Sequence, residues 1–146
     1  MDMRRLVGLN VRKIRERRGL KGVEAYHIID GQQRLTTLQY FLAALAMTLR
    51  ANEVSALQPV IDGCLWNPNT DTMEKPEIER FKVWPTFRDR EPYQAALKAA
   101  SRDELRSSFA ASFTQSGTLK KIGVDHPAAL EAIWFFADQI DEWLSP

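Results

Sequence analysis

Residues 26–38 constrain this chain more than any other stretch. Residues 26–29 are aromatic and β-branched around one histidine, a composition that favours a half-buried β-strand. Asp30 and Gly31 then predict a tight turn, because aspartate accepts hydrogen bonds from nearby backbone N–H groups and glycine tolerates positive φ. Leucines at helical spacing follow from Leu35. The stretch therefore predicts a strand, a turn and a long helix over residues 32–50.

The remaining pattern is mostly helical. Pro59 bends the helix expected at 53–65 or marks its start, and Asp89 and Ser101 are expected N-cap residues. Alternating residues predict a second strand at 81–84. The fold class expected is mainly α with one or two short strands (α+β). The other predicted elements are helices at 4–18, 90–100, 101–111 and from Asp125 or His126 to Leu144, with loops at 66–79 and 112–123.

Composition indicates one soluble globular domain. The chain has 146 residues, 45% of them hydrophobic and 27% charged. Cys64 is the only cysteine, which excludes an intramolecular disulfide and suits a reducing compartment. The most apolar window, residues 38–49, is too short to span a bilayer, and no signal-peptide pattern appears. We therefore expect a cytoplasmic protein without a membrane partner.

Positive charge is concentrated at the N-terminus. Residues 1–22 carry eight Lys and Arg against two acidic residues, a net charge of +6 that leaves −5 on the rest of the chain. A basic amphipathic helix of this kind favours contact with DNA, with Arg12, Arg15 and Arg18 as candidate contacts. The alternative is a solvated helix face without a ligand. We predict that residues 1–22 stand apart from a domain at 23–146.

Catalytic motifs of other classes are missing from the sequence. No Gly-x-x-x-x-Gly-Lys-Ser/Thr loop occurs, which argues against a P-loop NTPase. The two histidines, His27 and His126, lack the spacing of zinc ligands. Cys64 has no basic sequence neighbour that would lower its pKa, so an inert thiol is favoured over a nucleophile.

The segment Asp30-Gly31-Gln32-Gln33-Arg34 groups one carboxylate, two amides and a guanidinium around the expected helix N-terminus. A helix N-terminus attracts anions, Asp30 can hold a divalent cation, the two amides can donate to phosphate or sugar oxygens, and Arg34 can neutralise developing charge. The structural alternative is that Asp30 caps the helix and Arg34 pairs with a nearby carboxylate such as Glu24.

Residues 29–38 resemble the signature of the N-terminal domain of GmrSD-type restriction endonucleases, a family of the ParB/sulfiredoxin-like superfamily. Residues 82–90 are similar to a downstream Pro-Thr-Asn-x-Asp-Arg element of that family, with Phe87 in place of the asparagine. His126-Pro127, followed by the aromatic run at 134–136, also fits the family's helical region. The resemblance covers residues 23–144.

The resemblance implies binding and hydrolysis of a nucleoside triphosphate with Mg²⁺, coupled to restriction of modified foreign DNA in phage defence. The positions it implies as catalytic are Asp30, Gln33 and Arg34, with Asp30 also as a metal ligand. The positions it implies as cofactor-binding are Gly31, Gln32 and Thr36.

The family also carries further strands before the motif and often a nuclease domain after it. We therefore expect a truncated, partial ParB-like domain, with a partner chain that completes the sheet or supplies the nuclease. Two alternatives remain at this point: a small DNA-binding regulatory protein that acts through its basic helix, and an inactive gene remnant.

Overall fold

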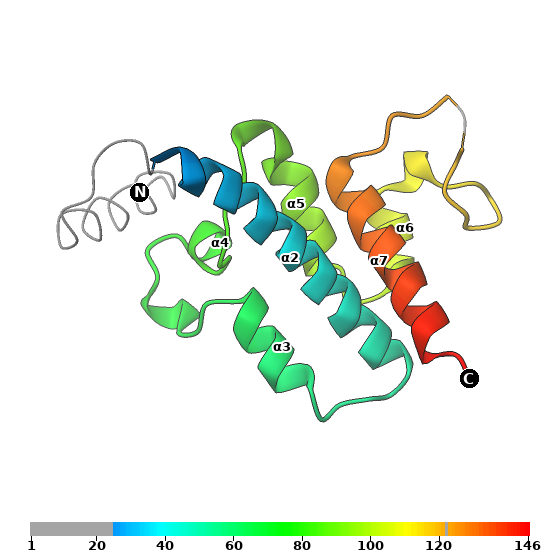
Figure 1. Cartoon of the computed structure of the whole chain (residues 1–146), viewed down its shortest axis with the longest axis horizontal. Coiled ribbons are helices and arrows are strands. Elements are labelled where there is room, and N and C mark those ends of the chain that lie inside the picture. The colour runs from blue at the N-terminus through cyan, green and yellow to red at the C-terminus, as the bar shows by residue number, and fades with distance from the viewer. Residues whose placement is uncertain (1–24, 122) are drawn as a thin grey trace.

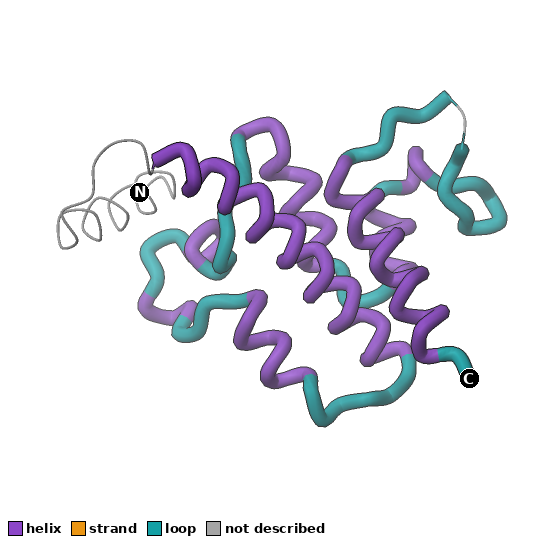
Figure 2. Tube along the Cα trace, in the orientation of Figure 1, coloured by secondary structure: helices purple, strands orange, loops and turns teal. Residues whose placement is uncertain are grey.

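The computed structural model describes residues 25–121 and 123–146, and their side chains from Gln33 onward. In this part of the chain, helices are joined by loops and no strand occurs (Figure 2). The basic segment 1–22, its predicted helix and the boundary at residue 22 lie outside the described residues. The elements are α2 (Ala25–Ala51), α3 (Gln58–Leu65), α4 (Pro76–Glu79), α5 (Arg90–Lys98), α6 (Arg102–Ser108) and α7 (Ala128–Leu144), with 3-10 turns η2 (Thr70–Thr72), η3 (Phe87–Asp89) and η4 (Ala110–Ser112).

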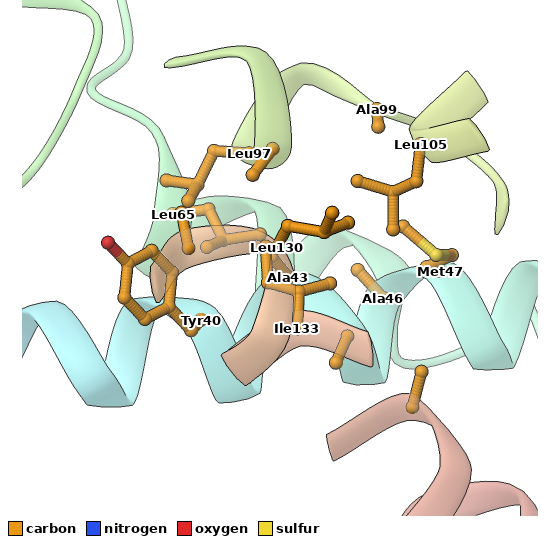
Figure 3. Close-up of a cluster of buried hydrophobic side chains, with 14 of the residues drawn as sticks. Tyr40, Ala43, Ala46, Met47, Leu65, Leu97, Ala99, Leu105, Leu130 and Ile133 are labelled. Atoms are coloured by element: carbon orange, nitrogen blue, oxygen red, sulfur yellow. The ribbon is translucent and has the colours of Figure 1, made fainter. Parts of the chain in front are cut away.

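Helix α2 is the axis of the fold. Figure 1 shows it running diagonally through the molecule, with α3 on one side and α7 on the other. Helix α5 packs against both α2 and α7. The alanines of α2, such as Ala43 and Ala44, are buried and let the neighbouring helices approach closely. The core cluster in Figure 3 joins side chains of α2, α3, α5, α6 and α7, among them Tyr40, Met47, Leu65, Leu97, Leu105, Leu130 and Ile133.

The strand predicted at 26–29 is wrong, because α2 already begins at Ala25 and continues unbroken to Ala51. The part of the chain described here offers no second strand that could pair with this segment, and an unpaired strand is not stable. Helix formers such as glutamine, leucine, alanine and methionine dominate the following residues and extend the helix backward through the motif. Gly31 opposes this extension by only about 1 kcal/mol. The expected strand–turn–helix unit of a ParB-like α+β fold is therefore replaced by a single helix.

The second predicted strand, at 81–84, is also wrong. Phe81 forms only an isolated antiparallel bridge with Trp66, and Asn67 completes it by donating its side-chain amide to the carbonyls of Glu79 and Phe81, at 2.7 and 3.1 Å. Phe81 and Trp84 are buried in an aromatic cluster, Val83 is half-buried and Lys82 is exposed. The two buried residues are three positions apart, so the burial does not follow the period of two that a strand in a sheet would show.

Helix boundaries follow local chemistry where a proline or a cap is present. Pro59 lies in the first turn of α3 and marks its true start. Ser101 caps α6 by accepting the Glu104 N–H at 3.2 Å, as its sequence predicted. Helix α7 begins after Pro127, so the caps predicted at Asp125 or His126 are wrong. None of the described helices is long and apolar enough to cross a membrane.

An arginine connects α6 to α7 at the edge of the core. The Arg102 guanidinium donates to Asp138 and Asp141, each at 2.7 Å, and lies 4.7 Å from the ring centre of Trp134. Its side chain is only 23% exposed, so water screens these pairs less than it screens ordinary surface ion pairs. The contact holds the start of α6 against the middle of α7.

The packing of α7 predicts a sharp contrast between two of its positions. Ile133→Ala should lower the free energy of unfolding by about 2–5 kcal/mol, because Ile133 is fully buried in the core and its loss leaves a cavity. Gln139→Ala on the exposed face of the same helix should change it by less than about 0.5 kcal/mol. Urea denaturation followed by circular dichroism measures both. Equal effects would mean that α7 does not pack as described.

Candidate functional site

Because α2 is continuous, the motif at residues 30–34 lies within a helix and not at a helix N-terminus. Gln33 is the ninth residue of α2, so the backbone N–H groups of residues 31–34 lie inside the helix and no helix N-terminus faces the motif. The predicted anion site made by a helix N-terminus at this point is wrong. Any recognition by the motif must come from its side chains. The structure describes those of Gln33, Arg34 and Thr36, whereas those of Asp30, Gly31 and Gln32 lie outside the described part.

Two segments that are some fifty residues apart in sequence meet in one cleft of about 280 Å³. Gln33, Thr36 and Tyr40 form its α2 side at a spacing of three and four residues, which places them on one helix face. The other side comes from the turn before α5, and the start of α7 closes one end. These remaining lining residues are Pro85, Thr86, Asp89 and Ala128.

Asp89 and Thr86 form a polar pair on the rim. The Thr86 hydroxyl donates to Asp89 Oδ2 at 2.7 Å, and both side chains are exposed to the solvent of the cleft. Asp89 occupies the N-cap position of α5, but its carboxylate makes no capping hydrogen bond. The sequence therefore predicted the position of Asp89 at the start of α5 correctly, whereas the capping role predicted for its side chain is wrong. A carboxylate that is not used to cap a helix is available to a ligand.

Two tyrosines in tilted ring contact lie beside this polar pair, and Tyr40 is the one that lines the cleft. The rings of Tyr40 and Tyr93 are 5.7 Å apart, and Figure 3 shows the Tyr40 hydroxyl at the edge of the core cluster. Burial, and secondarily the Asp89 carboxylate, raise the pKa of Tyr40 to about 12. Burial, and secondarily Tyr40, raise the pKa of Tyr93 as well. The buried Tyr93 hydroxyl has no hydrogen-bond partner among the described residues, and Tyr93 lies behind Tyr40 without lining the cleft itself.

The donors of the cleft fit a Mg²⁺ ion only when a ligand shares it. No group of three or more His, Cys, Asp or Glu side chains capable of holding a metal occurs among the described residues. Asp89 supplies one carboxylate, and Thr36 and Thr86 supply hydroxyl oxygens. Mg²⁺ in proteins is commonly held by one or two carboxylates together with substrate phosphates and water. The chemistry of the cleft therefore fits a metal–phosphate ligand better than a bare ion.

The structure brings together only part of the predicted site. Gln33 and Thr36 line the cleft, whereas Arg34 is exposed on α2 and does not line it. Tyr40, Thr86 and Asp89 line the cleft but were not predicted as site residues. Helical spacing from Gln33 identifies Tyr40 once the motif is known to be helical, and the second motif element contains the other two. The nucleic-acid candidates Arg12, Arg15 and Arg18 lie outside the described residues.

Fold and cleft together define a small helical domain in which two sequence motifs share one polar site. A family model for the N-terminal domain of GmrSD restriction endonucleases matches residues 14–139. The match covers most of the chain, which belongs to this family, and the resemblance expected from its two motifs is confirmed. No curated protein and no solved structure gives a significant match.

The buried tyrosine under the cleft predicts an alkaline loss of stability. Folding holds the Tyr40 phenol protonated up to a pKa of about 12, whereas an unfolded tyrosine ionises at its usual value of 10. The stability that the neutral Tyr40 phenol contributes is thus fully present below pH 10 and is lost as the pH rises toward 12. Urea unfolding across this range should show a smaller fall in Tyr40→Phe, which has no group to ionise. An identical fall in the variant and the wild type would contradict the assignment.

Proposed function

We propose that the cleft between α2 and the turn before α5 binds a nucleoside triphosphate together with Mg²⁺. The observation that carries the proposal is the convergence of the two family motifs: Gln33 and Thr36 from the first face Thr86 and Asp89 from the second. Membership in a restriction endonuclease family supports it. The volume of the cleft, about 280 Å³, lies near the lower end of the range for small-molecule sites and suits part of a nucleotide.

Each polar side chain has a role that its chemistry allows. The Gln33 amide and the Thr36 hydroxyl donate to phosphate or sugar oxygens. Asp89 carries the negative charge that a phosphate-bound Mg²⁺ requires, and the Thr86 hydroxyl orients its carboxylate through their 2.7 Å hydrogen bond. Tyr40 forms the floor, and its raised pKa keeps the phenol neutral at physiological pH, so no second negative charge opposes the phosphates.

Hydrolysis is the reaction proposed for the bound nucleotide. Water attacks the terminal phosphorus, the bond to the bridging oxygen breaks, and negative charge builds on the transferred and leaving oxygens. Bound Mg²⁺ supplies charge neutralisation. Arg34 does not line the cleft, and we propose that its long side chain reaches the bound phosphates from the neighbouring face of α2 to supply a guanidinium for the same purpose. Asp30 and Gln32, whose side chains lie outside the described part, remain proposed as a metal ligand or base and as a phosphate donor.

In the wider system, we propose that nucleotide hydrolysis is coupled to the restriction of modified foreign DNA in phage defence. The family assignment supports a restriction system and hence DNA as its target. A nuclease domain on the same or another chain would carry out the cleavage.

The Asp89 carboxylate provides the sharpest test of the proposed nucleotide site. Asp89→Asn keeps the size of the side chain and its ability to accept from Thr86 but removes the charge. It should weaken binding of a non-hydrolysable nucleoside triphosphate with Mg²⁺ by roughly 10–100-fold, the value of a charge-assisted contact. Isothermal titration calorimetry measures the affinity. Glu91→Gln is the matched control, since Glu91 is exposed two residues away and does not line the cleft. Equal affinity of the wild type, Asp89→Asn and Glu91→Gln would overturn the proposal that the nucleotide binds beside Asp89.

Arg34 is predicted to act on the rate of hydrolysis. Arg34→Ala should lower the turnover of a nucleoside triphosphate with Mg²⁺ by roughly 100-fold or more, because the charge that develops in the transition state loses its guanidinium. Lys82→Ala, which removes an exposed cation outside the cleft, should leave the rate unchanged. Release of inorganic phosphate is the measurement. Robust turnover that Arg34→Ala does not alter would show that the motif is not the catalytic element.

A further inference from the structure

A small basic pocket lies where the second half of α2, the end of α3 and the end of α5 meet, and it shares no lining residue with the cleft beside Asp89. Its volume is about 160 Å³. Arg50, Arg80 and Lys98 line it, and no acidic side chain of the described residues does. These cations come from the end of α2, the residue after α4 and the end of α5. Like charges around one pocket repel each other, and a bound anion would relieve that repulsion.

Two of the three cations are held by aromatic rings. The Arg80 guanidinium carbon lies 4.6 Å from the ring centre of Trp66, and the Lys98 ammonium lies 5.8 Å from that of Phe81. Neither cation forms an ion pair with a carboxylate of the described residues. Stacking uses the face of a guanidinium and leaves the N–H groups at its edge available to donate. The rings therefore position the charges without neutralising them.

Arg50 stands between the basic pocket and a neighbouring pocket of about 420 Å³. It donates to the Ala100 carbonyl at 3.1 Å, and its contact with Asp62 is long, at 3.8 Å. The Thr48 hydroxyl lines the neighbouring pocket, is buried and has no hydrogen-bond partner among the described residues. Three arginines and two aspartates give that pocket a net charge of +1: Arg50, Arg102, Arg106, Asp103 and Asp141. Positive charge thus continues from one pocket into the next.

The floor of the basic pocket is the core itself. Alanine side chains are too short to fill the space between the elements, which leaves the pocket open above them. The apolar floor also means that water screens a bound charge less than it does on an open surface. Figure 3 shows the buried side chains that form this floor, which are Ala43, Ala46, Leu65, Leu97 and Ala99.

We propose that the basic pocket binds a phosphate group. Sites that enclose a whole small molecule have volumes of about 300–1,000 Å³, so this pocket holds one charged group and not a complete nucleotide. Arginine forks and lysine ammonium groups are the usual phosphate ligands. A phosphate also presents oxygens in several directions and can accept from cations on three segments, whereas a carboxylate presents two oxygens in one plane.

The phosphate has two possible sources. It belongs either to the backbone of a nucleic-acid strand or to a small phosphate compound. A strand would place its next phosphate in the neighbouring pocket, on the other side of Arg50. A small compound would use the basic pocket alone.

Titration of the full chain with inorganic phosphate, followed by nuclear magnetic resonance, tests the site. Trp66 is the only one of the four tryptophans that lines the basic pocket, so its indole N–H signal reports on binding there. We expect a saturable shift of this signal with phosphate and none with sodium chloride at the same ionic strength. Arg80→Gln and Lys98→Gln should each weaken binding by roughly tenfold, because each removes a charge-assisted contact.

Two control variants make the result specific. Lys82→Gln should bind phosphate as the wild type does, because Lys82 is exposed outside the pocket, two residues from Arg80. Asp89→Asn should also leave the Trp66 titration unchanged, so failure of the proposed nucleotide site would not affect this test. Unchanged signals of the other three tryptophans show that the variants fold.

A second titration, with a short single-stranded oligodeoxythymidine, distinguishes the two sources. A backbone phosphate predicts tighter binding than inorganic phosphate. It also predicts a logarithmic salt dependence whose slope falls in magnitude by about 0.7 in each of Arg80→Gln and Lys98→Gln. A small phosphate compound predicts no gain over inorganic phosphate. A Trp66 signal that shifts with neither ligand, or that titrates alike in the wild type and both variants, would overturn the proposal.

Discussion

The packing of α2 against α7 is the interaction on which the rest of the structure depends. These two helices make the most extensive contact between elements in the described part of the chain, and they run in the same direction. Buried alanines on α2 allow the close approach, and the fully buried Leu130, Ile133 and Ala137 of α7 fill the space opposite. Without this contact, neither the cleft at one end of the pair nor an apolar groove at the other would have two walls.

The cleft between α2 and the turn before α5 is a consequence of that packing at the N-terminal ends of the two helices. Helix α2 contributes one face, the start of α7 contributes Ala128, and α5 holds the turn that carries Thr86 and Asp89. Tyr93 links these parts, since it is fully buried on α5 and its ring is in tilted contact with the ring of Tyr40 on α2. The side chains that line the cleft are therefore supported from behind by the core.

The same pair of helices forms a second hollow at its other end. This groove is lined mainly by apolar side chains of α2 and α7, among them Phe41, Leu45 and Ile140. It exists because α2 and α7 both continue beyond the part of their surfaces that is buried in the core.

The sequence by itself determined most of the helices, many of their boundaries and the family, whereas α4 lies within the loop predicted at 66–79. Helical periodicity in residues 32–50 and 130–140, the proline in the first turn of α3 and the serine cap of α6 act through local interactions, and these are readable without a fold. The two motifs identified the family because their residue order is specific. Leu144 continues the apolar spacing of Ala137 and Ile140, yet it is 41% exposed, because the core ends before the helix does.

Only the tertiary structure decided whether residues 26–29 and 81–84 are strands and which site residues meet. Both segments have β-like composition, but a strand exists only with a hydrogen-bonding neighbour, and that depends on distant parts of the chain. For the same reason Asp89 and Gln33, separated by 56 positions in sequence, share a cleft that no local pattern predicts. Local chemistry made α2 a helix through its motif, and packing against α5 and α7 made one face of that helix a site.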